Sequence, residues 1–238
     1  MKTMTLTVCR RPIYTRRTIE ALLQCDGISD YAVGIVVDPQ CDETLRVVHE
    51  LTAGTGWSLY KATERLGCNR AILTALHIGF VHWKSDYHVH LEDDTVPAPD
   101  CLRWFEWARK YGANPEVFNV AAYSRDSDGA ADEARARRWF TPWGWATWRD
   151  RFDECASRWA GPNDWSWDIS VNHVFRGDRC EIYPALARTT NIGADLGEHA
   201  TPELWNLEQR NDRWAGATGD RCSEWRFAAA AAASGVSA

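Results

Sequence analysis

Residues 31–37, Tyr-Ala-Val-Gly-Ile-Val-Val, form a nearly continuous apolar run that ends at Asp38-Pro39. Short apolar runs rich in β-branched residues predict strands. A strand that is apolar at almost every position is covered on both faces, as in parallel sheets that lie between layers of helices. This run therefore restricts the chain to folds in which a sheet is buried inside helices.

The segments around this run alternate between strand and helix patterns. Further strands are predicted over residues 5–9, 57–60 and 87–91. Helices are predicted to begin at Thr15, at Asp42 and after Asn69. This order predicts an α/β fold, with a mixed, mostly parallel, Rossmann-like sheet that helices flank on both faces.

Composition narrows the function classes. Hydrophobic residues make up 45% and charged residues 25% of the 238 positions, the balance of a globular protein. A net charge of −6 gives no overall attraction to nucleic acid or acidic membranes. There is no membrane-length apolar run, no secretory signal pattern and no Cys-x-x-Cys pair among the 8 cysteines. We therefore expect a cytoplasmic protein with reduced thiols and no membrane segment.

Charged residues follow several predicted strands at the point where each strand ends. Arg10 follows the first strand, Asp38 the second, and the triplet Glu92-Asp93-Asp94 the strand over 87–91. In an α/β sheet these ends lie along one rim, where such sheets bind ligands. The arginine would meet phosphate and the lone aspartate a base or ribose, with Arg70 as a second phosphate candidate. The rim is thus suited to a nucleotide diphosphate.

The acidic triplet is suited to a hard divalent cation as well as to a ribose hydroxyl. Carboxylate oxygens, together with phosphate oxygens of a substrate, are the ligands that such cations prefer. Two prolines after the triplet forbid regular pairing, and Asp100 is placed to cap a helix that begins near Cys101. An acidic surface turn is the ordinary alternative, and the shared rim favours function over it.

The second half of the chain loses the regular alternation. Residues 124–138 are polar and predict a mobile loop or a lid over the site. Its basic end could clamp phosphates or an anionic acceptor, although a solvated helix face is the more ordinary explanation; the residues are Arg135, Arg137 and Arg138. Residues 205–227 are expected to fold back over the core as a helix.

Tryptophans gather in residues 139–150 and again beside a carboxylate. Fourteen tryptophans in the chain suggest sugar or base stacking as well as packing. Trp143, Trp145 and Trp167 are candidates for one wall of a cleft, with a structural aromatic cluster as the alternative. Asp168 follows Trp167, and a carboxylate among apolar groups can act as a general base. A glycine-rich segment ends at His199, which could complete a metal or phosphate site.

In these motifs the chain resembles GT-A nucleotide-sugar glycosyltransferases, most closely the N-acetylglucosaminyltransferase I type. The resemblance rests on the following motifs, in this order from about residue 5 to 207: Cys9-Arg10-Arg11, Val37 to Cys41, Leu91 to Asp94 with Ala98-Pro99-Asp100, Phe140 to Trp145, Trp167-Asp168 and Asn191 to His199. It implies a single GT-A domain over residues 1–227, with a nucleotide-binding half (1–100) and an acceptor and catalytic half (101–227). Residues 228–238 are a low-complexity tail.

The resemblance also implies roles for the site residues. Asp94, in a DXD-type motif, would bind Mn²⁺ or Mg²⁺ at the donor diphosphate. His199 is a further candidate metal ligand on the glycine-rich pattern alone, and the resemblance does not imply it. Glu92 and Asp93 would face the donor sugar or ribose, and Arg10 and Asp38 would hold the nucleotide. Asp168 would be the catalytic base, with Asp164 as second choice because the spacing there requires a gap.

We therefore expect a metal-dependent, inverting transferase that moves a hexosyl or N-acetylhexosaminyl group from a nucleotide-diphosphate sugar, a UDP-sugar by preference. The acceptor stays open between a glycan, a protein side chain and a hydroxylated base in DNA. A nucleotidyltransferase and a non-enzymatic carbohydrate-binding protein are the alternatives. The first would release pyrophosphate, and the second would bind no nucleotide.

Overall fold

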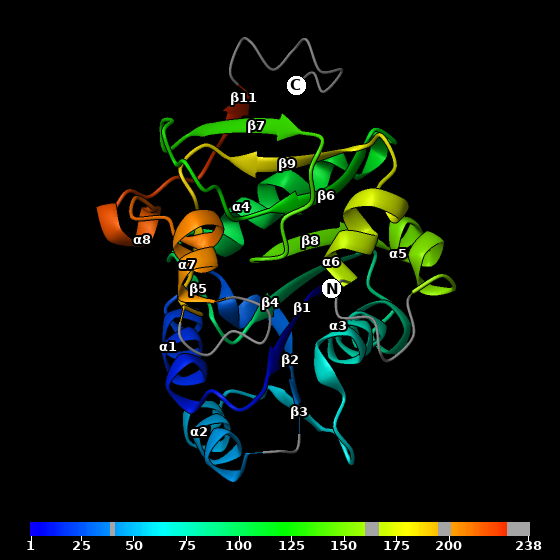
Figure 1. Cartoon of the computed structure of the whole chain (residues 1–238), viewed down its shortest axis with the longest axis vertical. Helices are drawn as coiled ribbons and strands as arrows, with labels where there is room; N and C mark the ends of the chain where they lie inside the picture. The colour runs from blue at the N-terminus through cyan, green and yellow to red at the C-terminus, as the bar shows by residue number, and fades with distance from the viewer. Residues whose placement is uncertain (39–40, 160–166, 195–200, 228–238) are drawn as a thin grey trace.

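A sheet of nine strands runs through the part of the chain that the computed structural model describes, residues 1–38, 41–159, 167–194 and 201–227 (Figure 1). The strand order is β11-β7-β9-β6-β8-β4-β1-β2-β3. The strands are β1 (Lys2–Val8), β2 (Tyr31–Val37), β3 (Ser58–Lys61), β4 (Tyr87–Glu92), β6 (Val117–Ala121), β7 (Glu133–Arg137), β8 (Trp145–Trp148), β9 (Cys180–Pro184) and β11 (Arg226–Phe227).

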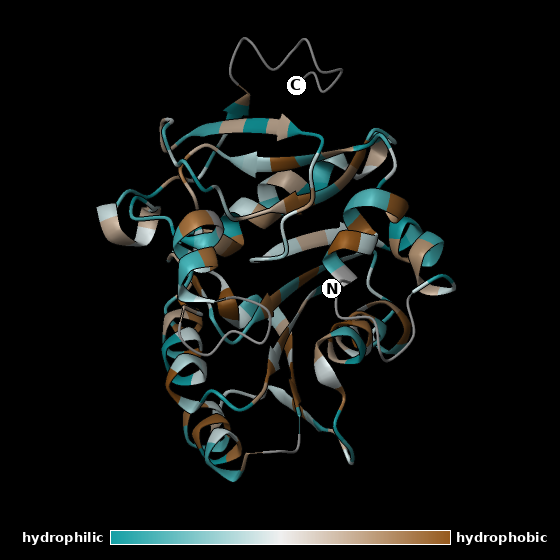
Figure 2. Ribbon diagram, in the orientation of Figure 1, coloured by the Kyte–Doolittle hydropathy of each residue, from teal (hydrophilic) through white to brown (hydrophobic). Residues whose placement is uncertain are grey.

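The first half of the sheet is parallel. β1 pairs in parallel with β2 and β4, and β2 with β3. β2 has the bounds that its apolar run predicts, and hydrophobic residues run along these central strands in Figure 2. β8 then runs antiparallel to both β4 and β6, while β6 and β9 are parallel again. The prediction of a mixed, mostly parallel sheet is confirmed.

Helices cover both faces of the sheet. The helices are α1 (Pro12–Leu23), α2 (Asp42–Thr52), α3 (Gly67–His77), α4 (Cys101–Ala108), α5 (Arg149–Ala156), α6 (Trp167–Ser170), α7 (Pro202–Leu204) and α8 (Ala215–Thr218). Ile19 of α1, Val48 of α2 and Trp104 of α4 share one buried cluster with the strands. Ile72 of α3 and Phe152 of α5 belong to a second cluster. None of the described helices combines the length and apolar character that a membrane span requires.

Helix α1 begins earlier than predicted. Pro12 occupies its first turn, where a missing N–H and a fixed φ fit a helix start. Thr15 is therefore buried inside the helix and does not cap it. Its hydroxyl donates instead to Asp93 at the end of β4, 3.3 Å away.

Three other expectations are wrong. Residues 124–138 are not one loop or lid, because residues 133–137 form β7, which lies between β11 and β9 in the sheet. Residues 205–227 form the π-helical turn Trp205–Gln209, α8 and β11 rather than one helix. The prolines after the triplet do not prevent pairing, because β5 (Thr95–Pro97) pairs antiparallel with β10 (Thr189–Asn191).

Candidate active site

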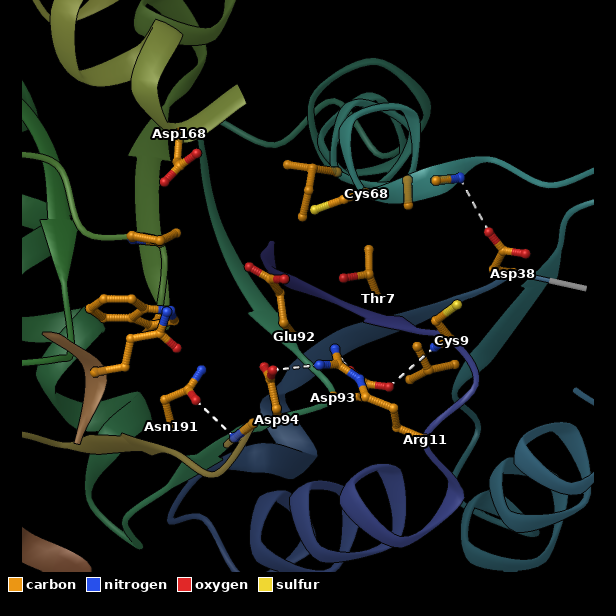
Figure 3. A pocket seen from close by; sticks show the side chains of 18 of the residues that line it. Thr7, Cys9, Arg11, Asp38, Cys68, Glu92, Asp93, Asp94, Asp168 and Asn191 are labelled. Carbon is orange, nitrogen blue, oxygen red and sulfur yellow. Dashed lines mark hydrogen bonds and ion pairs between the residues drawn. The ribbon is translucent and has the colours of Figure 1, made fainter. Parts of the chain in front are cut away.

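A cavity of about 820 Å³ opens along the carboxyl ends of β1, β2 and β4, the rim that the sequence predicts (Figure 3). This volume is within the range of small-molecule sites in proteins. Its charged lining residues are Arg10, Arg11, Asp38, Arg65, Glu92, Asp93, Asp94 and Asp168. The chain thus brings together groups from both of its halves.

One arginine joins two carboxylates of the triplet. Nη1 of Arg11 lies 2.7 Å from Oδ2 of Asp94, and its Nη2 donates to Oδ1 of Asp93. Burial alone would lower the pKa of Arg11, but Asp94 and Asp93 outweigh it and raise that pKa above its ordinary value. Sequence reasoning noted the pair Arg10-Arg11 and chose Arg10, which also lines the cavity. It missed Arg11 as the residue that bridges the acids.

Asp93 holds the turn between β1 and α1. Its Oδ2 accepts from the backbone N–H of Cys9 at 3.1 Å and from the Thr15 hydroxyl. The Thr18 hydroxyl donates to its carbonyl at 2.8 Å. Its side chain is only 1% exposed. The carboxylate that was expected to meet the donor sugar thus fixes the loop that carries Arg11.

The loop after β10 lies directly on Asp94. The N–H of Ile192 donates to the Asp94 carbonyl at 2.8 Å. Asn191 Oδ1 accepts from the N–H of Gly193 and from the Trp205 indole N–H. A Cβ on Gly193 would lie 2.4 Å from Oδ2 of Asp94, so only glycine permits this approach. The glycine-rich pattern pointed to this segment, but not to Gly193 as the residue that borders the carboxylate.

Asp38 stabilises the start of α3 through one of its two carboxylate oxygens. Its Oδ2 accepts from the N–H groups of Leu66 and Gly67, at 3.1 and 3.2 Å. Such N–H groups at a helix start have no partner within the helix. Its Oδ1 is buried without a hydrogen-bond partner in the part of the chain that the structure describes. That oxygen could accept from a base or a ribose.

Glu92 and Asp168 enter the cavity from different elements, the end of β4 and helix α6 (Figure 3). Burial, and then the charge of Asp94, raise the pKa of Glu92 well above its usual range. The charge of Asp168 adds to this rise, so the two carboxylates lie close enough to interact. The candidate base therefore faces the candidate metal and diphosphate region across one cavity.

Aromatic residues form another side of the cavity. Trp143, Phe140 and Trp139 line it, and Trp139 is 52% exposed with its ring 6.2 Å from that of His173. Trp143 packs edge-on against Tyr123. Trp139 belongs to the tryptophan-rich segment that predicts a wall, although no sequence pattern reveals which of its rings is exposed.

The expectation that Trp145 lines this wall is wrong. Trp145 is 2% exposed, and its ring packs edge-on against Phe140 and His90. Because β8 pairs with β4, Trp145 lies opposite His90 in the core of the sheet. Trp167 begins α6, and its side chain is outside the described part of the structure.

A buried carboxylate fixes the aromatic segment. Glu181 of β9 is 0% exposed and accepts from the N–H and the hydroxyl of Thr141, at 2.7 and 2.9 Å. Arg137 and Asn119 donate to it as well. Thr141 lies between Phe140 and Trp143, so these bonds hold the wall in place.

Arg70 does not line the cavity. Its Nε donates to the carbonyl of Leu66 and its Nη1 pairs with Glu64, so its guanidinium stabilises the turn before α3. Arg65, from the same turn, lines the cavity instead. The predicted second choice for the base, Asp164, and the predicted ligand His199 lie outside the described residues.

The basic end of the predicted lid lies elsewhere. Arg135 pairs with Asp128 and Glu133, and Arg137 with Glu181. Both arginines belong to β7 and neither lines the cavity. Both guanidinium groups form ion pairs with carboxylates of the chain itself.

A divalent cation would fit this cavity only if protein carboxylates and substrate phosphates coordinate it together. Within the described ranges, no three His, Cys, Asp or Glu side chains converge as a ready-made metal site. Asp94 nevertheless offers a hard carboxylate that lines the cavity. Cations such as Mg²⁺ are often held by one or two carboxylates plus substrate phosphates and water. The donor set therefore suits a cation that binds together with a diphosphate.

Solved structures with the same fold include glycosyltransferases. One is a mannosyltransferase from Pyrobaculum calidifontis, PcManGT, in complex with GDP-Man and Mn²⁺ (TM-score 0.57, 20% identity, 77% of this chain and 54% of that chain covered). Another is S. aureus TarS 1–349, in complex with UDP (0.57, 12%, 77% and 60%) or UDP-GlcNAc (0.56, 10%, 77% and 58%). This chain thus spans little more than half the length of each of these solved chains.

These likenesses show the fold: the chain has the GT-A architecture, as its motifs predict. No model of a protein family matches the chain, and no curated protein sequence does. The finer resemblance to the N-acetylglucosaminyltransferase I type stays a prediction.

Proposed function

We propose that this chain is a metal-dependent, inverting glycosyltransferase that uses a nucleotide-diphosphate sugar. The observation that carries the proposal is the position of Asp168, which faces Glu92-Asp93-Asp94 across one cavity at the nucleotide rim of a GT-A fold. The side with the acidic triplet would bind the diphosphate, and the side with Asp168 would bind the acceptor.

In the proposed reaction, Asp168 accepts the proton of the acceptor hydroxyl while that oxygen bonds to the anomeric carbon of the donor sugar. The bond from this carbon to the diphosphate breaks on the opposite face, so the configuration inverts. The guanidinium groups that line the cavity stabilise the negative charge that grows on the departing diphosphate.

Asp94 would hold the cation, Mn²⁺ or Mg²⁺. When bound, the cation would supply Lewis-acid stabilisation of the diphosphate oxygens. Support comes from the carboxylate on the cavity surface and from PcManGT, which was crystallised with Mn²⁺.

We propose that Asp38, Arg10 and Arg65 hold the nucleotide. The neighbours were crystallised with GDP-Man, UDP and UDP-GlcNAc, so both uridine and guanosine donors should be tested. We keep a UDP-sugar, with a hexosyl or N-acetylhexosaminyl group, as the first choice.

For the acceptor, the aromatic wall favours a sugar hydroxyl. Trp143 and the exposed Trp139 offer flat apolar faces of the kind on which sugar rings stack. The pairing of Arg135 and Arg137 within the chain leaves a DNA acceptor without two of the basic residues that suggested it.

The proposal is tested by a screen of nucleotide sugars with Mn²⁺ and simple glycosides. We expect release of a nucleoside diphosphate and a product of inverted anomeric configuration by NMR. Release of pyrophosphate from a nucleoside triphosphate would instead support a nucleotidyltransferase. If the chain binds glycans but no nucleotide, it is a carbohydrate-binding protein.

Asp168→Asn tests the base directly. We expect turnover to fall by roughly 10²–10⁴-fold, the range for loss of a general base, with donor affinity unchanged in calorimetry. Asp178→Asn, at an exposed position beyond α6, is the control and should keep full turnover. Near-normal turnover of Asp168→Asn would remove Asp168 from this role.

A further inference from the structure

We propose that Arg11 is an internal counter-cation, which holds Asp94 when no ligand is present, weakens the binding of a divalent cation alone, and leaves Asp94 when a diphosphate arrives with the cation. The inference rests on the proposed function and adds a role for Arg11. It makes binding of the cation and of the nucleotide mutually dependent.

The geometry places Arg11 in competition for the candidate metal ligand. Its Nη1 is 2.7 Å from Oδ2 of Asp94, while its Nη2 binds Asp93 (Figure 3). The backbone of Gly193 packs against the same Oδ2. A cation that binds Asp94 at this oxygen therefore competes with the guanidinium.

The charges explain why an arginine is needed there. Three successive carboxylates line the cavity, and Asp93 and Asp94 are 1% and 11% exposed. Like charges on neighbouring residues destabilise one another in a site with little water. Arg11 offsets this repulsion while the cavity holds no cation.

Arg11 can leave without loosening the turn. It is 16% exposed at the cavity surface, and Asp93 keeps the N–H of Cys9 and the hydroxyl of Thr15 as donors. A diphosphate offers oxygen pairs that match the guanidinium fork as well as carboxylates do. Arg11 would therefore exchange Asp94 for phosphate oxygens in the same cavity.

This exchange predicts coupled binding. A cation alone must compete with Arg11 and binds weakly, whereas a diphosphate draws Arg11 away and opens Asp94. By linkage, each ligand raises the affinity for the other by the same factor. Removal of Arg11 should tighten binding of the cation alone and abolish most of the coupling.

The test is Mn²⁺ binding without nucleotide, followed by electron paramagnetic resonance, in the full chain and in Arg11→Gln. We expect Arg11→Gln to bind Mn²⁺ roughly tenfold more tightly, the factor that corresponds to one charged hydrogen bond. UDP or GDP should then raise Mn²⁺ affinity less in Arg11→Gln than in the unaltered chain. The control Arg17→Gln makes the same charge change at an exposed position of α1 and should have the affinity of the unaltered chain.

Two further variants keep the test decisive. Arg11→Lys keeps the charge but cannot span two carboxylates, so its Mn²⁺ affinity should lie between the other two. Asp94→Asn in the Arg11→Gln background should remove the gained affinity. If neither Arg11 variant binds Mn²⁺ more tightly than the unaltered chain, the proposal is overturned. If the unaltered chain with Mn²⁺ binds no nucleotide sugar, the proposed function fails, whatever Arg11 does to the metal alone.

Discussion

Arg188 and Arg11 both bind buried aspartates, but only Arg11 borders the cavity. Nε of Arg188 lies 3.0 Å from Oδ2 of Asp100, and its Nη1 and Nη2 donate to the carbonyls of Leu186 and Ala131. The N–H of Cys222 donates to the same Asp100 oxygen. Arg188 is 0% exposed, and this group joins β10, the loop before β7 and the C-terminal segment.

The two groups differ in what their donors bind. Both terminal nitrogens of Arg188 bind backbone carbonyls, so this guanidinium stabilises the fold. Those of Arg11 bind two carboxylates at a cavity surface, where a ligand can take their place. An arginine–aspartate pair thus indicates a site only when it also borders a cavity.

Arg188→Leu should give the largest effect on stability. Breaking a buried pair leaves an uncompensated charge on Asp100, which costs about 3–5 kcal/mol. Arg11→Gln should cost only about 1 kcal/mol, because Asp93 keeps other donors. Urea unfolding of both variants, monitored by circular dichroism, checks this. Equal losses in the two variants would erase the distinction between the groups.

Low pH should reduce the stability of the fold through two buried histidines. His88 and His90 of β4 are buried and bonded to Thr3 and Thr5 of β1, and burial lowers both pKa values to about 3. The unfolded chain binds these protons below about pH 6.5, so stability is full above that pH and falls as pH drops toward 3. The two histidines together should cost up to about 2.7 kcal/mol per pH unit.

Unfolding free energies at pH 7.5, 6 and 5 test this slope. His88→Gln should remove about half of it. His82→Gln, at an exposed position, should leave it unchanged. Constant stability from pH 7.5 to 5 in the unaltered chain would show that these histidines are not held neutral.

Gly193→Ala should give the smallest change in stability and act on the cavity instead. The added Cβ would lie 2.4 Å from Oδ2 of Asp94, so that carboxylate must move. We expect nucleotide and Mn²⁺ to bind about tenfold more weakly, with little change in unfolding free energy. Unaltered affinity would mean that Asp94 can shift without harm or is not a ligand.

Much of the sheet and its ligand-binding rim could be predicted from sequence, because they depend on local patterns. The apolar run of β2 sets its bounds, and the parallel topology brings Asp38 and Asp94 to one rim. The sequence also pointed to Asp168, which lines the same cavity from the other half of the chain.

The rest depends on contacts between distant residues. Asp100 has the pattern of a helix cap, yet its side chain binds Arg188, far along the chain. Trp145 belongs to the tryptophan-rich segment that predicts one wall of a cleft. The pairing of β8 with β4 places it in the core instead. Which arginine of the pair Arg10-Arg11 bridges the acids depends on where α1 begins.

The central claim is that this cavity binds a nucleotide-diphosphate sugar together with a cation. The most direct measurement is calorimetric titration of the full chain with UDP- and GDP-sugars, in Mn²⁺ and again in EDTA. We expect at least one donor to bind in Mn²⁺ and to lose most of its affinity in EDTA. Absence of binding by every nucleotide sugar in Mn²⁺ would contradict the account.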